Sequence, residues 1–182
     1  LSKNKKKIEF LFKKAKKNLV QNIKRLNLVN KGSIIEYPIE SIKFLEIISK
    51  KINKYDGILL FFDYGYKQKE NKDTLQSVKK HKYLNILKEP GAADITHHIN
   101  YELFSEILKK NKLEVKKVVS QSEFLQKLGI IKRANILSKT LSFREKADIY
   151  YRLKKLLHQD EMGNLFKVLS AENGKNGFNL GF

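Results

Sequence analysis

The 182-residue sequence predicts one α/β domain over residues 1–182, in which helices cover a sheet. With 41% hydrophobic residues, a chain of this length can bury a real core. Residues 58–62 form a continuous apolar run without alternation, which is typical of strands buried on both faces of a parallel sheet. Apolar residues recur at steps of three and four before and after this run, which indicates amphipathic helices.

The first thirty residues predict a basic amphipathic helix. Residues 3–29 are rich in lysine and contain a single acid, Glu9, while Ile8, Leu11, Ala15 and Leu19 repeat at helical spacing. Two interpretations remain open. The helix is either a basic arm that contacts an anionic surface or a packed helix whose lysine face is solvated.

A turn and a short strand are expected over residues 32–38, followed by a helix over residues 39–55. Asp56 and Gly57 end this helix and lead into the apolar strand at residues 58–62. That strand delivers Asp63-Tyr64-Gly65 to its carboxyl end. Ligands of open α/β sheets bind outside the carboxyl ends of strands, so the triplet is a predicted ligand site.

The segment 66–99 is long and polar, and it predicts a substrate-side loop region. Only one short helix is expected within it, around residues 74–82, before a break at Pro90 and Gly91. Loops of this length inside compact domains are usually functional or disordered. We interpret this one as functional because it carries Asp73, His81, Asp94, Thr96, His97 and His98.

The rest of the chain, from residue 100 onward, predicts four helices and two strands. Asn100 has a side chain that suits the N-cap of the first of these helices. Gly129 is expected to end the second, and Met162-Gly163 the last. The expected helices span residues 101–110, 123–128, 131–139 and 143–159, and the strands span residues 113–121 and 164–172.

The net charge of +19 invites a nucleic-acid hypothesis, but the composition makes nucleic acid an unfavoured partner. Lysine supplies almost all of the 38 basic residues, whereas base readout and phosphate forks rely on arginine. An AT-rich genome also encodes lysine-rich chains. The chain contains no cysteine, which favours a reducing compartment, and no apolar run is long enough to span a membrane.

Several site chemistries lack their sequence signatures. Neither an H-x-x-x-H nor an H-E-x-x-H spacing occurs, and adjacent histidines on extended chain point to opposite sides, so no metal is expected. The G-x-S-x-G elbow of serine hydrolases is missing. No G-x-G-x-x-G or G-x-x-x-x-G-K-[ST] turn occurs either, so any nucleotide cradle must lie outside these residues.

Five blocks together carry a family resemblance: "GILLFFDYGY", "DTLQSVKKHKY", "PGAADITHHINYELF", "SQSEFLQKLGIIKRANIL" and "MGNLFKVLS". In order and spacing, from about residue 32 to residue 168, they resemble the MidA-type family of S-adenosylmethionine-dependent methyltransferases. That family includes a mitochondrial complex I assembly factor that methylates an arginine of a partner subunit.

The resemblance implies the C-terminal part of a doubly wound, Rossmann-like methyltransferase fold with additional helices. The cofactor would be S-adenosylmethionine, with its binding residues in an N-terminal half that this chain lacks, and a start at Leu1 rather than Met fits such a truncation. The implied activity is protein arginine N-methylation in respiratory complex I assembly. The substrate would be a protein, such as a complex I subunit, in the bacterial cytoplasm or the mitochondrial matrix.

Candidate site residues follow from the matching positions. A carboxylate can grip a guanidinium bidentately, which suits Asp63 or Asp94, although Asp63 fits a local backbone cap equally well. His97 and Asn100 depart from the family pattern, where a small residue and Asp are usual. The expected catalytic residues are Asp63, Asp94 and His98, and the expected substrate-binding residues are Tyr64, Gly65, His81, Thr96, Gln121 and Arg133.

The alternative function is a different class of protein. The basic first helix could make the chain a non-catalytic binding module that holds RNA or an anionic protein partner. A glycine-rich turn upstream of these residues would favour the enzyme. The sequence does not identify the methyl acceptor or the oligomeric state.

Overall fold

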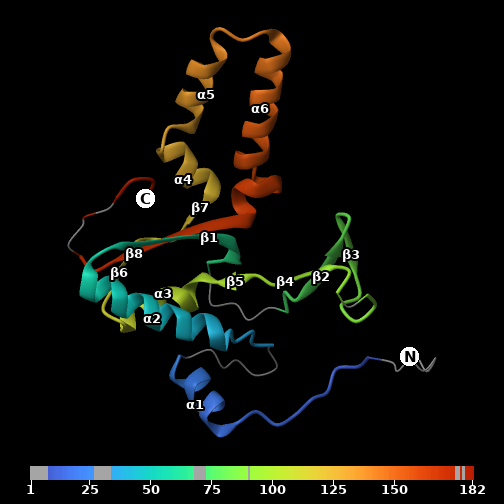
Figure 1. The fold of residues 1–182 in the computed structure, drawn as a ribbon, viewed down its shortest axis with the longest axis vertical. Coiled ribbons are helices and arrows are strands. Elements are labelled where there is room, and N and C mark those ends of the chain that lie inside the picture. Colours follow the sequence, from blue (N-terminus) through green and yellow to red (C-terminus); the bar gives the residue numbers. More distant parts are fainter. Residues whose placement is uncertain (1–7, 27–33, 68–72, 90, 175–176, 178) are drawn as a thin grey trace. The chain divides into compact units, whose positions relative to one another are not determined.

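The computed structural model describes residues 8–26, 34–67, 73–89, 91–174, 177 and 179–182 of the chain (Figure 1). These residues belong to two compact units. The first combines Leu1–Tyr37 with Asn71–His98, and the second combines Pro38–Glu70 with Ile99–Phe182. No helix among the described residues has the length and apolar character needed to cross a membrane.

The basic helix of the first unit is shorter than the sequence predicts. Helix α1 spans Lys17–Arg25 and buries none of its residues. Residues 8–16 are not helical, while residues 1–7 and 27–33 lie outside the described part. Lys13, Lys14, Lys16 and Lys17 crowd like charges into one turn, which opposes helix formation there. The short strand expected before Pro38 is also absent from residues 34–38.

The loop region expected at residues 66–99 contains a small antiparallel sheet. Strands β2 (Gln76–Lys79), β3 (Lys82–Leu84) and β4 (Asp94–Thr96) are ordered β3-β2-β4. The helix predicted around residues 74–82 is therefore wrong. Lys80 and His81, with φ of 49° and 61°, form the two-residue turn between β2 and β3. Hairpin turns of this kind usually carry Asn-Gly, so the sequence held no clear signal for it.

The sheet of the second unit is built on a long antiparallel pair. Strand β1 (Ile58–Tyr66) pairs with β8 (Phe166–Glu172) from Ile58 opposite Glu172 to Tyr64 opposite Phe166. Three short strands join it: β5 (Ile99–Asn100), β6 (Glu114–Val115) and β7 (Val119–Ser120). The order is β5-β1-β8-β6, with β7 also on β8, and β5 alone of these strands pairs in parallel, at Gly65 and Tyr66 of β1. The one strand expected at residues 113–121 is thus two.

The strand at residues 58–62 is confirmed, but its expected burial on both faces is wrong. Alternate residues of β1 stay partly open, with Leu60 42% exposed. The open residues lie on one face of β1, whereas the other face packs against α3 through Phe61; the open residues are Ile58, Leu60, Phe62 and Tyr64. Strand β8 has neighbours on both sides and is the buried strand, from Lys167 to Glu172. A continuous apolar run does not specify which strand lies at the centre.

Helices α2 (Ile39–Tyr55) and α3 (Tyr101–Lys110) pack against each other. Among the described residues, α3 supplies more of the buried apolar side chains than any other element. The predicted cap is confirmed because the Asn100 side chain accepts a hydrogen bond from the amide of Leu103 at 3.1 Å. The rings of Tyr101 and Phe104 each lie 5.9 Å from the ring of Phe61 on β1. The buried α3 residues are Tyr101, Leu103, Phe104, Ser105, Ile107 and Leu108.

A helical segment between β7 and β8 projects away from this sheet (Figure 1). It comprises α4 (Gln121–Lys127), α5 (Ile130–Ser138), α6 (Phe143–Leu157) and the π-helical turn η1 (Gln159–Gly163). Gly129, with φ of 82°, ends α4 as predicted. In η1 the amide of Gly163 donates to the carbonyl of His158, and a Cβ at position 163 would lie 2.2 Å from the carbonyl oxygen of Leu157. Only glycine fits this tight turn.

Candidate functional site

The carboxyl end of β1 is held in place by one tyrosine of α3. The hydroxyl of Tyr101, which is fully buried, accepts from the amide of Asp63 at 2.8 Å. The same hydroxyl lies 3.0 Å from the carbonyl oxygen of Asp63 and 2.9 Å from that of Lys167 on β8. Burial raises the pKa of Tyr101 above its ordinary range, so the hydroxyl stays neutral. These contacts tie β1, β8 and α3 together at the predicted ligand site.

Position 65 has no room for a side chain, so it requires glycine. A Cβ there would lie 2.4 Å from the carbonyl oxygen of Ile99 and 2.6 Å from the Tyr101 ring. The close approach lets β5 begin its pairing with β1 at this residue. Gly65 therefore has a packing role beside any role in substrate binding.

The carboxylate of Asp63 makes a local contact. Its Oδ1 accepts from the amide of Tyr64 at 2.7 Å, which is the backbone cap that the sequence left open as an alternative. The Tyr64 ring packs against Phe166 with the ring centroids 4.3 Å apart. The triplet thus has a defined conformation, and it lies within β1, which continues to Tyr66 instead of ending at residue 62 as the sequence predicted.

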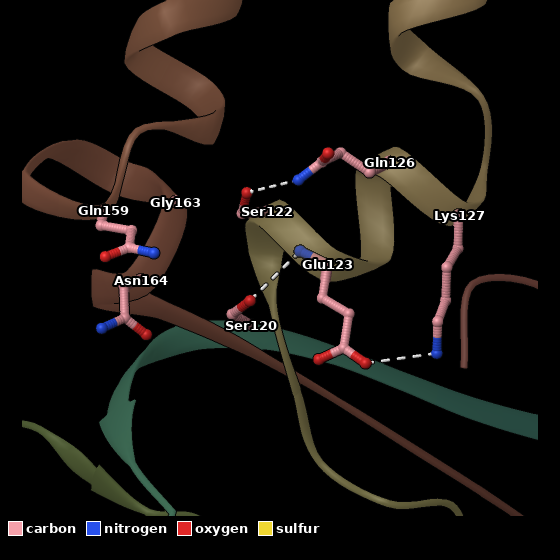
Figure 2. A pocket seen from close by; sticks show the side chains of 8 residues that line it. All are labelled: Ser120, Ser122, Glu123, Gln126, Lys127, Gln159, Gly163 and Asn164. Carbon is pink, nitrogen blue, oxygen red and sulfur yellow. Dashed lines mark hydrogen bonds and ion pairs between the residues drawn. The ribbon is translucent and has the colours of Figure 1, made fainter.

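Two adjoining pockets lie next to this strand end. The smaller, of about 340 Å³, borders Gly65 and the turn η1. The larger, of about 480 Å³, lies between η1 and α4 (Figure 2). Gln159 and Asn164 line both, so we treat the two as one polar groove. The smaller pocket is lined by Gly65, Gln159, Asp160, Glu161, Asn164 and Leu165, and the larger by Ser120, Ser122, Glu123, Gln126, Lys127, Gln159, Gly163 and Asn164.

The side of the groove formed by α4 is fixed by hydrogen bonds among its own side chains. Figure 2 shows the Ser120 hydroxyl accepting from the Glu123 amide at 3.1 Å and the Gln126 side chain donating to the Ser122 hydroxyl at 2.9 Å. The ammonium of Lys127 lies 3.2 Å from the Glu123 carboxylate. This wall offers hydroxyl, amide and carboxylate groups, which suit a polar ligand better than an apolar one.

A buried lysine, Lys167, contacts one of the residues that line the groove. Lys167 is 8% exposed, and its ammonium donates to the backbone carbonyl and the side-chain oxygen of Asn164. Burial, and secondarily the nearby charge of Lys67, lower the pKa of Lys167. Burial also lowers the pKa of Lys67, which Glu123 partly offsets. Lys167 thereby orients Asn164, one of the two residues common to both pockets.

Gln121 and Arg133, both expected to bind substrate, lie on the helical segment. The Gln121 side chain is buried and donates to the carbonyl of Leu156 at 3.0 Å, which ties the start of α4 to the end of α6. Arg133 lies exposed on α5. Neither residue is among those that line the groove.

The remaining candidates belong to the first unit, and of these His98 contacts Thr74. The Thr74 hydroxyl donates to Glu36 at 2.5 Å and accepts from the amide of His98 at 2.8 Å. Thr96 accepts from the Gln76 side chain at 3.0 Å across β2 and β4. Asp94 is exposed on β4, and His81 is exposed in the β2–β3 turn.

Sequence reasoning missed Glu36 and the residues of η1. Glu36 lies in a segment without a motif, and it reaches Thr74 only through the fold. Gln159, Asp160, Glu161 and Asn164 stand around Met162-Gly163, which the sequence marked only as a break. The expectation of no metal site stands as a prediction; the described residues contain no group of three potential metal ligands among His, Cys, Asp and Glu.

A family model of S-adenosyl-L-methionine-dependent methyltransferases matches residues 2–119, more than half of the chain. The chain belongs to this family. Curated relatives include the mitochondrial protein arginine methyltransferase NDUFAF7 of Xenopus tropicalis, 29% identical over 70% of the chain. The Drosophila melanogaster homologue is 29% identical over 78% of the chain. The chain spans only 29% and 32% of the lengths of these two relatives.

Solved structures support the fold assignment. A protein from Burkholderia thailandensis superposes over 90% of this chain and 45% of its own, with a TM-score of 0.75 at 23% identity. A second, from the same organism and bound to S-adenosyl-homocysteine, covers 92% of this chain and 44% of its own with a TM-score of 0.73. The predicted Rossmann-like methyltransferase fold is thereby confirmed.

Proposed function

We propose that this chain forms the methyl-acceptor part of an S-adenosylmethionine-dependent protein arginine N-methyltransferase. The observation that carries the proposal is the similarity to curated protein arginine methyltransferases over most of the chain. The polar groove at the carboxyl end of β1 supports it, because open α/β sheets bind ligands at such ends. This family membership favours the enzyme over a basic binding module.

The groove has groups that suit a guanidinium. Asp160 and Glu161 line its smaller pocket, and Asp63 lies on the neighbouring strand β1, two residues before Gly65, which borders the same pocket. In this proposal the carboxylates bind and orient the arginine side chain, since charge-assisted hydrogen bonds to a planar guanidinium fix its direction as well as its position. Placement of this kind lowers the barrier of a displacement at a methyl group, because the two reacting atoms are already held in line.

The residues of this chain do not form a binding site that suits the cofactor. The sequence has no glycine-rich nucleotide turn, and the described pockets are lined by hydroxyl, amide and carboxylate groups. S-adenosylmethionine would supply the methyl group. We therefore propose that this chain binds the methyl acceptor. We expect weak or no cofactor binding by residues 1–182 alone.

The roles of Asp94 and His98 in catalysis, and of Tyr64, His81, Thr96, Gln121 and Arg133 in substrate binding, remain proposals that rest on the matching family positions. A role in respiratory complex I assembly, with a complex I subunit as substrate, is proposed on the same similarity. The location would then be the mitochondrial matrix in a eukaryote and the cytoplasm in a bacterium.

The test is methyl transfer by the longest form of the protein that its gene encodes. Transfer from S-adenosylmethionine to arginine would be followed by mass spectrometry of an acceptor protein. We expect Asp63→Asn to lower the rate at least ~10-fold, about 1.4 kcal/mol of transition-state stabilisation, with cofactor affinity unchanged. Glu46→Gln, an exposed position on α2, is the control. Methylation of lysine instead of arginine would contradict the proposed substrate class.

A further inference from the structure

The hairpin of α5 and α6 is unusual in how little of it is buried. The two helices are joined by residues 139–142 and project away from the sheet of their unit (Figure 1). Helix α6 has fifteen residues, and none of them is buried. Helix α5 buries only Ala134 and Ser138. A projecting helix pair with so little burial presents most of its side chains to whatever surrounds it.

The tip of this hairpin, residues 136–144, exposes large apolar side chains. Phe143 is 89% exposed, and Ile136 and Leu137 are about half exposed. Phe143 is held at the first position of α6 by a capping box, in which Ser142 and Glu145 satisfy each other's backbone amides. The aromatic ring is thus presented by a defined backbone rather than by an irregular loop.

The hairpin is also strongly basic. Its acids are only Glu145, which is engaged in the capping box, and Asp148, which pairs with Arg152 at 2.8 Å. Lys139 and Arg144 flank the apolar tip directly. The basic residues between positions 130 and 157 are Lys132, Arg133, Lys139, Arg144, Lys146, Arg152, Lys154 and Lys155.

The positions of the arginines say more about function than the overall excess of lysine does. The chain has only four arginines, and Arg133, Arg144 and Arg152 all lie on this hairpin. A composition that favours lysine explains basic residues everywhere, but it does not explain arginines gathered on one element. The guanidinium group binds phosphate through two parallel hydrogen bonds, which an ammonium cannot do.

We propose that the tip of the α5–α6 hairpin binds the surface of an anionic lipid membrane. Phe143, Ile136 and Leu137 would enter the boundary between headgroups and acyl chains, about 5–10 Å deep, while Lys139 and Arg144 contact lipid phosphates. An acidic polypeptide would match the charge, but apolar residues at a projecting end suit a flat, deformable surface better. This inference is independent of the proposed methyl transfer.

A fluorescent reporter tests insertion of the tip directly. The chain contains no tryptophan, so Phe143→Trp places a single indole there. We expect its emission to shift to the blue with vesicles of phosphatidylcholine and about one-third phosphatidylserine, and not with phosphatidylcholine alone. Phe44→Trp, at an exposed phenylalanine of α2, is the matched control and should not shift. Equal shifts at both positions, or none at position 143, would overturn the proposal.

Vesicle flotation separates the tip from diffuse attraction by a chain of charge +19. We expect Phe143→Ala and Arg144→Glu each to weaken binding about tenfold or more. Phe44→Ala and Lys51→Glu make the corresponding aromatic and charge changes on α2 and should change vesicle binding little. Equal losses in both sets would overturn the proposal. So would a blue shift of Phe143→Trp with polyglutamate, which indicates an acidic polypeptide, or dimers that Phe143→Ala abolishes, which indicate a second copy.

Discussion

The ring of Tyr101 on α3 occupies the space that a side chain at Gly65 of β1 would need. Ring atoms of Tyr101 lie 2.6 and 2.7 Å from the Cβ position at Gly65, and its hydroxyl accepts from the Asp63 amide at 2.8 Å. One residue therefore touches both ends of the Asp63-Tyr64-Gly65 triplet. The conformation of the predicted ligand site depends on the packing of α3 against β1.

Gly65→Ala should destabilise the protein. The added methyl group meets the carbonyl oxygen of Ile99 and the fully buried Tyr101 ring, and neither can move away without displacing β5 or α3. Overpacking of this kind costs about 1–3 kcal/mol. Urea denaturation measures the change, and an unchanged midpoint would show that the triplet can relax away from α3.

Tyr101→Phe should lower the free energy of unfolding by about 1–3 kcal/mol, because the substitution leaves the partly buried Asp63 amide without the hydroxyl to which it donates. Tyr83→Phe is the control: the Tyr83 side chain is 77% exposed, and its loss should change stability by about 0.5 kcal/mol or less. Denaturant titration of both variants decides this. Similar effects at the two positions would remove Tyr101 from its supporting role.

The elements that the sequence predicts well are those whose signals are local. The cap at Asn100, the end of α4 at Gly129 and the strand at residues 58–62 each follow from one residue type or one apolar run, and each is confirmed. The order and direction of strands are not local. The antiparallel pairing of β1 with β8 joins residues about a hundred positions apart, and nothing in either strand specifies it.

The candidate site also combines features with a local sequence signal and features without one. The triplet at residues 63–65 is predicted as a ligand site because such sites follow strand ends, and it stays a prediction. The groove beside it could not be predicted, since Gln159 and Asn164 line it only because the π-helical turn folds back toward β1. Lys80 and His81 explain the missed sheet of the first unit, because two consecutive positive φ values at residues other than glycine or asparagine carry no sequence signal.

Alkaline pH should change stability in two opposite steps. The pKa of Lys167 is lowered by burial from its ordinary 10.5, so the unfolded chain binds more protons there and stability rises with pH between the lowered value and 10.5. The pKa of Tyr101 is raised by burial from 10.0, so the folded state holds that proton longer and stability falls above pH 10. Lys67, whose pKa is also lowered, adds to the rise.

Variants separate these contributions. Lys167→Met should flatten the rise while keeping the fall, and Tyr101→Phe should remove the fall while keeping the rise. Denaturant titrations at closely spaced pH values measure both slopes. A rise that survives in Lys167→Met with undiminished slope would assign it to Lys67 or to other lysines.

Ser142→Ala should loosen the start of α6. The Ser142 hydroxyl accepts from the Glu145 amide, and the Glu145 carboxylate accepts from the Ser142 amide at 2.9 Å, so the substitution removes one half of the capping box. Loss of a serine N-cap costs about 1 kcal/mol. Hydrogen exchange of the amides in the first turn of α6 should become several-fold faster. Ser41→Ala, which changes an exposed serine of α2, is the control and should leave exchange in α6 unchanged. Because α6 buries none of its residues, little else holds this end of the helix, and unchanged exchange in Ser142→Ala would mean that contacts with α5 fix the position of Phe143 instead.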